Sequence, residues 1–310
     1  MSGPVTSADV PAEAQRAAPE ACALEINESR ESRVAAIGVR RALPQRGRRT
    51  VGPWCFVDHT GPAIISAPRG LDVAPHPHSG LQTVTWLLEG EALHRDSLGS
   101  EQVIVPGQLN LMTAGWGVAH SEEGTGSYDG NLHGVQLWIA QPSATREGPA
   151  AFEHHRELPR RDLDAAVATV LVGDLDGTAS PARRDTDHLG VDLALGAGAT
   201  TVPLRADFEH ALVTLVGAVR LDGQIIEPGH LAYLGTGRTE IALAAREPTR
   251  ILLLGGVPFD EDVLMWWNFV ARTRAEIIEA HRSWIAAGDR FGRVDSPLPR
   301  IEVGPPPWRL

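Results

Sequence analysis

The chain has 310 residues, enough to bury a core without disulfides or metal staples and comfortable for two domains. With 43% hydrophobic and 22% charged residues the composition is globular, and 32 glycines with 23 prolines favour a turn-rich β protein. The net charge of −11 argues against a nucleic-acid-binding surface, and no apolar run reaches the roughly 18 residues of a membrane helix. We therefore expect neither nucleic acid nor a membrane as a direct partner.

The N-terminal segment predicts no folded structure. Residues 1–22 are small, polar and rich in Pro and Ala, which is typical of a disordered extension, and they lack the basic-then-apolar pattern of a signal peptide. The two cysteines, Cys22 and Cys55, are too few for a disulfide framework, so we expect both to be reduced. These features together predict a cytoplasmic protein.

Residues 23–147 show short apolar runs that are broken by turn residues about every ten positions. This rhythm predicts an antiparallel sandwich or barrel, which we take as the N-terminal domain. The predicted strands include Val34–Val39, Cys55–Val57, Val84–Leu88, Val103–Val105, Leu109–Met112 and Val135–Ile139.

The strand rhythm occurs a second time, after an interruption. Residues 148–165 are rich in charge and Pro without a clear strand, which predicts a linker, and residues 166–292 then repeat the pattern. A repeated β pattern predicts two similar domains. The second set of predicted strands includes Val167–Val172, Val191–Leu195, Ala211–Val216, Val219–Leu221, Ile241–Ala244 and Ile251–Leu254.

One helix is predicted near the end of the second domain. Thr273 is suited to the N-cap and Glu276 to position N3 of a capping box, and Gly288 is suited to the C-cap. Apolar residues between them recur at helical spacing, so we expect an amphipathic helix packed on a barrel. Residues 293–310 form a Pro-rich tail that we expect to be extended.

Two ligand pairs carry the chemistry. His76 and His78 flank Pro77, and about forty residues later His120 and Glu122 are again two positions apart. Residues i and i+2 of a strand point to the same side, so two such pairs on neighbouring strands can converge inside a barrel. Three imidazoles and one carboxylate suit Fe(II), and also Mn, Co, Ni or Zn. We expect one divalent metal per chain, with open positions for a substrate and dioxygen.

The two pairs, separated by a hairpin and the Pro106-Gly107 turn, form a signature of cupins. The carboxylate that cupins usually carry a few residues after His-x-His is missing near Gln82, and Glu122 supplies one instead. With this departure the chain resembles the pirin family, roughly from Leu24 to Gly292. The matching motifs are Val39–Pro44, Arg48–Pro62, His76–Thr85, Met112–Glu122 and Trp267–Val270.

The resemblance implies an all-β bicupin: two stacked antiparallel β-barrels of jelly-roll type with a C-terminal helix and a metal in the N-terminal barrel alone. It implies iron held at the positions of His76, His78, His120 and Glu122. It also implies quercetin 2,3-dioxygenase activity, found in several members, or a redox-sensitive co-regulator role, found in others. The family often has Glu where this chain has Gln82, a departure that leaves all four ligands in place.

Other histidines have simpler interpretations. His94 and Asp96 can support a metal ligand from behind, although a hairpin turn is favoured. For His59 we favour structural hydrogen bonding, and for His133 a place outside the pocket. In the second domain Glu209 and His210 are adjacent, so they cannot both face inward, which predicts a barrel without metal. Core packing is favoured for Trp266 and Trp267, and a solvated pair for His154 and His155.

Two functions of different classes follow. The first is an enzyme, a dioxygenase that opens the ring of a small aromatic, flavonol-like substrate, with the metal as Lewis acid and Glu122 as ligand and base. Met112, Val84 and Trp86 are candidates for an apolar pocket lining. The second is a metal-dependent, redox-sensing regulator that binds a protein partner without turnover. A third, weaker hypothesis is other cupin chemistry on a small acidic metabolite.

Overall fold

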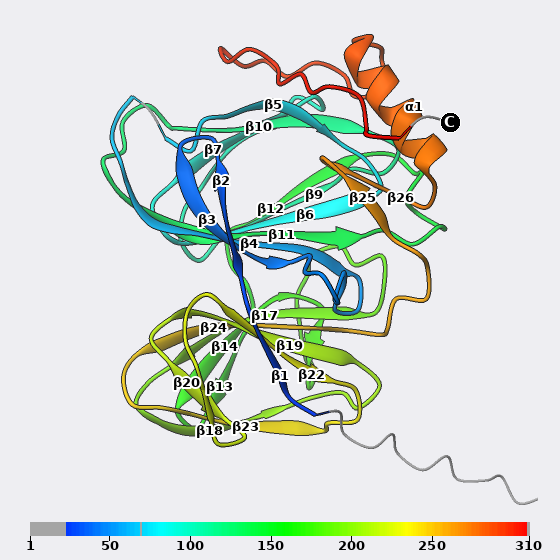
Figure 1. The fold of residues 1–310 in the computed structure, drawn as a ribbon. Helices are drawn as coiled ribbons and strands as arrows, with labels where there is room; N and C mark the ends of the chain where they lie inside the picture. Colours follow the sequence, from blue (N-terminus) through cyan, green and yellow to red (C-terminus); the bar gives the residue numbers. More distant parts are fainter. Residues whose placement is uncertain (1–22, 69, 309–310) are drawn as a thin grey trace, which may run out of the picture.

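The structure is a computed structural model, and it describes residues 23–68 and 70–308. Nearly all regular structure is β, in two stacked halves with one helix on the upper half (Figure 1). Each half pairs a seven-stranded sheet with a four-stranded one, as two similar domains predict. The predicted extension of residues 1–22 and Cys22 lie outside the described residues. Among those described, no helix is long and apolar enough to cross a membrane.

The N-terminal half holds two sheets that face each other. The small N-terminal sheet consists, in spatial order, of β5 (Val73–His78), β10 (Val118–Glu123), β7 (Ala92–Asp96) and β8 (Glu101–Ile104). The large N-terminal sheet consists of β12 (Ala151–His155), β9 (Leu109–Thr113), β6 (Leu81–Glu89), β11 (Gly130–Ala140), β4 (Trp54–Ile65), β3 (Ile37–Leu43) and β2 (Arg30–Val34).

The C-terminal half repeats this arrangement. Its large sheet consists of β1 (Glu25–Glu28), β22 (His230–Gly235), β19 (Glu209–Val216), β24 (Thr249–Gly256), β17 (His188–Leu195), β14 (Ala166–Val172) and β13 (Arg160–Leu163). Its small sheet consists of β18 (Gly198–Pro203), β23 (Glu240–Ala245), β20 (Val219–Leu221) and β21 (Gln224–Ile226). Two short hairpins remain: β15 (Asp174–Leu175) with β16 (Thr178–Ala179), and β25 (Leu264–Trp266) with β26 (Phe269–Ala271).

The two large sheets pack against each other and form the interface between the halves. One hydrophobic cluster draws on both sheets, with Val84, Trp86 and Leu137 from the first and Val213 and Leu252 from the second. Polar bonds cross the same interface. The indole N–H of Trp86 donates to Asp192 Oδ2 at 3.1 Å, and Arg250 pairs with the same carboxylate. A buried charge that is hydrogen-bonded from both sides fixes how the sheets meet.

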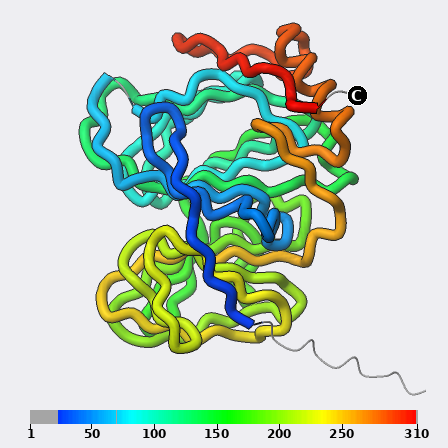
Figure 2. The backbone as a smooth tube through the Cα atoms, viewed as in Figure 1, coloured from blue at the N-terminus to red at the C-terminus, as the bar shows by residue number. Residues whose placement is uncertain are grey.

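Two predicted boundaries are wrong in detail. Strands β12 and β13 lie inside residues 148–165, which we expected to be a strand-free linker: β12 pairs with β9 and β13 with β14. Strand β1 belongs to the large C-terminal sheet, through pairing with β22, although it begins the segment assigned to the first domain. Figure 2 shows this blue segment running along the lower half before it enters the upper one. All three are edge strands. The partners of β1 and β12 lie far away in sequence, so local pattern does not reveal these two strands, while β13 is a short, mostly polar strand in a hairpin with β14.

The C-terminal helix α1 spans Arg274–Ile285 and begins as predicted, because Thr273 Oγ1 accepts a hydrogen bond from the Glu276 N–H. Its end differs from the prediction: Ala286 is the C-cap and Ala287 takes the positive φ of 51°, one residue before Gly288. The tail that follows lacks regular structure and lies on the N-terminal half, where the Ile301 N–H donates to the Pro75 carbonyl at 2.8 Å.

Candidate metal centre

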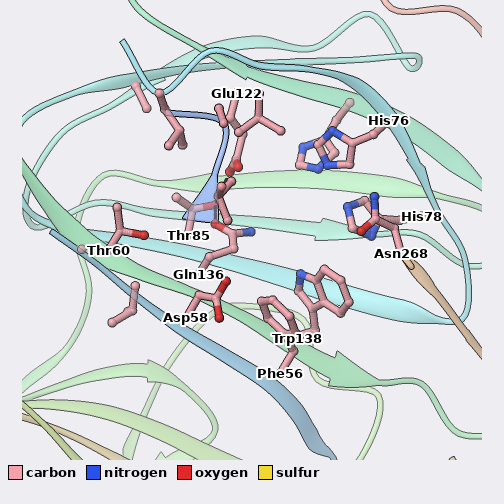
Figure 3. A pocket seen from close by; sticks show the side chains of 18 of the residues that line it. Phe56, Asp58, Thr60, His76, His78, Thr85, Glu122, Gln136, Trp138 and Asn268 are labelled. Carbon is pink, nitrogen blue, oxygen red and sulfur yellow. Dashed lines mark hydrogen bonds between the residues drawn. The ribbon is translucent and has the colours of Figure 1, made fainter. Parts of the chain in front are cut away.

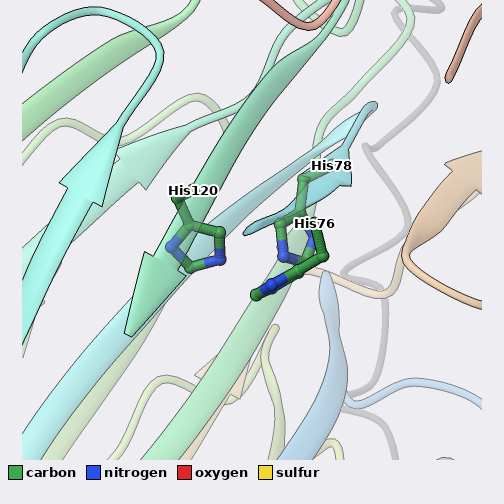
Figure 4. A group of neighbouring side chains, drawn as sticks. All are labelled: His76, His78 and His120. Atoms are coloured by element: carbon green, nitrogen blue, oxygen red, sulfur yellow. The ribbon is translucent and has the colours of Figure 1, made fainter. Parts of the chain in front are cut away.

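Strands β5 and β10 bring the predicted ligand pairs together. The strands are antiparallel neighbours, and His120 stands directly opposite His76. Directly opposed residues and residues two apart share a face of a sheet, so His76, His78 and His120 all project from one face. Figure 4 shows the three imidazoles gathered between their strands. The two pairs therefore bring their three histidines together, as their spacings predict.

The three imidazoles form a compact, buried cluster. Each offers one nitrogen, and these three atoms lie within 4.8 Å of one another. The ring centroids of His76 and His120 are 4.4 Å apart, and those of His78 and His120 are 4.9 Å apart. Nitrogens that share one ion at about 2.1 Å are separated by about 3 to 3.5 Å, so small ring rotations suffice to close such a site.

Burial keeps these histidines neutral. Desolvation lowers the pKa of His76 to about 4 and lowers the pKa of His78 and His120 well below the ordinary value. Neutral imidazoles have the free lone pairs that a metal needs. His76 Nδ1 donates to the Ala74 carbonyl at 2.8 Å, which leaves Nε2 for a ligand. The Nδ1 atom of His78 is buried and has no hydrogen-bond partner in the described part of the chain. The donor set and this orphaned nitrogen fit a divalent metal.

Glu122 lies in the same cavity but outside the cluster of three nitrogens. Its Oε1 atom is 3.2 Å from Thr85 Oγ1, which is also 2.9 Å from Gln136 Oε1 (Figure 3). Burial raises the pKa of Glu122 above the ordinary value, since the buried charge loses hydration. Glu122 as a fourth ligand stays a prediction, and it requires the carboxylate to turn from Thr85 towards the imidazoles.

The cluster opens into a cavity of about 510 Å³ between the two N-terminal sheets. Phe56 and Trp138 form a flat aromatic wall, with stacked rings 4.0 Å apart, and Trp138 also meets His78 edge to face at 5.1 Å. Farther along the same side, Asp58 accepts two 2.7 Å bonds from Arg41. Figure 3 shows the wall and Asp58 across the cavity from Glu122 and His76. The cavity thus combines nitrogen ligands, an aromatic wall and a polar side.

Known proteins share this architecture. The family models described as Pirin and Pirin C-terminal cupin domain match residues 36–139 and 190–292. The chain belongs to the pirin family. It is 46% identical, over 90% of each chain, to a Pseudomonas aeruginosa protein named "Putative quercetin 2,3-dioxygenase", and 37% identical to a pirin-like protein of Caulobacter vibrioides, covering 84% of this chain and 94% of that one. A crystal structure of quercetin 2,3-dioxygenase from Acinetobacter baumannii aligns with a TM-score of 0.89 at 40% identity, covering 93% and 97% of the two chains. These matches confirm the two-cupin, all-β fold.

Three residues that we considered for the lining of the pirin pocket lie elsewhere. Val84 and Trp86 face the interface between the halves. Met112 packs in the hydrophobic cluster that includes Phe56 and Trp138, but it does not line the cavity itself. Alternation along β6 explains the error for Val84 and Trp86. Thr85 and Leu87 line the cavity, so residues 84 and 86 must point away from it.

Gln82, where the family often has Glu, lies on that same outward face. Its Nε2 donates to Thr113 Oγ1 at 2.9 Å, and its side chain does not reach the cavity. The departure from the family pattern therefore leaves the ligand cluster unaltered.

The remaining candidates divide between strand and interface positions. His94 and Asp96 lie on β7, and Asp96 also begins the turn that we favoured, since its Oδ1 accepts from the Leu98 and Ser100 N–H groups. The imidazoles of His59 and His133 contact each other through Nε2 atoms 2.8 Å apart, away from the cavity.

In the second half, Glu209 and His210 point to opposite sides, as predicted. Glu209 accepts from the Gly52 N–H and from the Tyr233 hydroxyl, while His210 packs against Phe208.

Sequence reasoning missed most of the cavity wall. Phe56, Asp58, Gln136 and Trp138 come from β4 and β11, which pair with each other across more than seventy residues. Trp267, which we assigned to core packing, lines the cavity with Asn268 and Ile301. The alternation of side chains along a strand shows which residues share a face. It shows which face lines the cavity only when one inward-pointing residue is already known.

Proposed function

We propose that this pirin-family protein is a metal-dependent dioxygenase of quercetin 2,3-dioxygenase type, with His76, His78, His120 and Glu122 as ligands of one divalent metal. The observation that carries the proposal is the buried cluster of three neutral imidazoles at the edge of a 510 Å³ cavity with an aromatic wall. Fe(II) is our first choice of metal, and Mn, Co, Ni and Zn suit the same donor set. The names of the Pseudomonas and Acinetobacter relatives support the choice of reaction.

The cavity residues suit a flat aromatic substrate. The stacked pair of Phe56 and Trp138 gives an apolar surface on which a fused ring system can lie, next to His78. Arg41 and Asp58 present a charged pair to hydroxyl groups at the far end of such a ligand. These contacts would orient a flavonol with its chelating hydroxyl and carbonyl oxygens towards the imidazoles.

A bound metal would supply Lewis acidity, which lowers the pKa of the substrate hydroxyl beside it. Glu122 is the base in our proposal. It lies in the cavity, and burial raises the pKa of its carboxyl, which favours proton uptake from a weak acid. When the carboxylate turns from the imidazoles to Thr85, that hydroxyl would hold one of its oxygens, so that proton uptake and release occur at a defined place. The resulting electron-rich enolate would react with dioxygen and release carbon monoxide on ring opening.

The test is an oxygen-dependent assay with single metals. Protein loaded separately with Fe, Mn, Co, Ni or Zn is given quercetin with and without air, and quercetin absorbance, oxygen uptake and carbon monoxide are measured. We expect metal-dependent loss of quercetin in air alone. The matched control is His78→Ala treated with the same metals. No turnover above this control with any metal would contradict the proposal and favour a metal-dependent regulator that binds a protein partner.

Glu122→Gln separates binding from turnover. The amide keeps an oxygen that can contact a metal but cannot accept a proton, so we expect most metal to remain bound while turnover falls by 100-fold or more. Full turnover in Glu122→Gln would refute the assignment of the base while leaving the metal site intact.

A further inference from the structure

A buried chain of polar groups stands behind His120. His120 Nδ1 lies 3.4 Å from His94 Nδ1, and His94 Nε2 lies 3.2 Å from Asp96 Oδ2. The side chains of His94 and Asp96 are 4% and 0% exposed, and Phe152 stacks on His94 with ring centroids 4.3 Å apart. Strand pairing fixes the arrangement, because Asp96 stands opposite His120 and His94 stands opposite Glu122. Neither His94 nor Asp96 lines the cavity.

The chemistry of the three groups determines where the protons lie. A carboxylate can only accept, so His94 Nε2 must carry the proton that is shared with Asp96 Oδ2. For the neutral form of His94, whose ring carries a single proton, Nδ1 is then the acceptor that faces His120. His120 Nδ1 consequently carries a proton and donates it to His94. The lone pair of His120 is left on Nε2.

We propose that Asp96 and His94 are positioning residues that fix the tautomer and ring orientation of His120, so that its Nε2 lone pair is presented to the metal. The inference rests on the proposed metal site and does not depend on quercetin turnover. Outer partners of metal-bound histidines hold the ring and raise its basicity, and their loss typically lowers metal affinity 10- to 100-fold.

Asp96→Asn tests the direction of the chain with almost no change of shape. Asp96 Oδ1 accepts from the backbone N–H groups of Leu98 and Ser100, both at 2.9 Å, so the amide oxygen of Asn must keep that place. The amide NH₂ group then faces His94 Nε2, which becomes an acceptor. His94 Nδ1 now carries the proton and points it at His120, which must place its own proton on Nε2. The wrong tautomer thus blocks the metal-binding nitrogen.

The experiment compares the wild type with D96N, H94L and the double variant H94L/D96N. Co(II) affinity is measured by competition with a chelator, and the ring-nitrogen NMR shifts of His94 and His120 are recorded without metal. We expect His94 to be protonated at Nε2 in the wild type and at Nδ1 in D96N, with D96N binding Co(II) 10- to 100-fold more weakly. Leu at 94 removes the misdirected N–H, so the double variant should bind like H94L and more tightly than D96N.

Several results would each overturn the proposal. They are protonation of His94 at Nδ1 in the wild type and an unchanged Co(II) affinity in D96N. A further one is a loss of Co(II) affinity in the double variant that equals the product of the losses in D96N and H94L. Complete loss of Co(II) binding in H94L, as in His120→Ala, would make His94 a ligand itself and would also overturn it. Failure of the wild type to bind Co(II), with the NMR tautomers as expected, would instead count against the proposed metal site.

Discussion

Metal affinity should depend only weakly on pH, because burial has already removed the protons that compete for the imidazoles. An exposed histidine of ordinary pKa near 6.5 is neutral about 3% of the time at pH 5, so a site of three such residues would lose about 10⁴-fold in affinity between pH 7 and 5. Desolvation lowers the pKa of His76 to about 4, and the pKa values of His78 and His120 also lie well below normal. At a pKa of about 4, His76 would cost only about 1.1-fold over the same range, and the lowered pKa values of His78 and His120 reduce their cost in the same direction.

The pKa of Glu122 is shifted in the opposite direction to those of the histidines, so Glu122 is the ligand that gives the affinity a pH dependence. Burial raises the pKa of its carboxyl, so the carboxylate form needed for ligation is lost as pH falls through that raised value. One proton gives at most a tenfold loss of affinity per pH unit. We therefore expect log affinity to change by no more than one per pH unit in the wild type, and to be nearly flat in Glu122→Gln.

The measurement is a Co(II) titration against a chelator whose own protonation is known, at half-unit steps from pH 7 to pH 5. If log affinity changed by nearly three per pH unit, the histidines would be titrating like exposed residues. That result would refute the reasoning from burial. A slope of one that persists in Glu122→Gln would show that the competing proton belongs to another group.

Three further predictions concern the site and the interface. Alanine at His76, His78 or His120 should remove the metal while far-UV circular dichroism at 25 °C stays native, and unfolding of all three variants would show that the metal is structural. Elemental analysis of loaded protein should give one tightly bound metal per chain, and two would direct attention to Glu209 and His210. Asp192→Ala should destabilise the protein by about 3 kcal/mol in thermal unfolding, since Arg250 and Trp86 Nε1 lose their buried acceptor. Asp192→Asn should destabilise the protein clearly less than Asp192→Ala does. Equal destabilisation by the two substitutions would contradict this account.

The histidine cluster could be predicted from the sequence because its geometry is local. Two residues that are two apart on a strand share a face, so His76 and His78 needed one further condition, that the strand of His120 be their neighbour. Strands β5 and β10 meet that condition. Glu122 shares the face as well, but the direction of its carboxylate depends on Thr85, which comes from the opposite sheet. No local pattern reports a contact across the cavity.

The aromatic wall and the domain boundaries could not be predicted for the same reason. Phe56 and Trp138 meet because β4 and β11 pair in one particular register, and a shift of one strand by one residue would turn its ring out of the cavity. The short, mostly polar strands β1, β12 and β13 have little pattern of their own and are defined by their partners. Sequence therefore predicts the positions within a strand better than the neighbours of that strand.

The large N-terminal sheet connects the candidate site to the second half of the molecule. Both of its faces are buried: β6 turns Thr85 into the cavity and Trp86 into the interface, where Asp192 of the C-terminal half binds the indole. The strand that holds Trp86 against Asp192 also places Thr85 within hydrogen-bond distance of Glu122. The candidate site and the interface between the halves thus share one strand, β6.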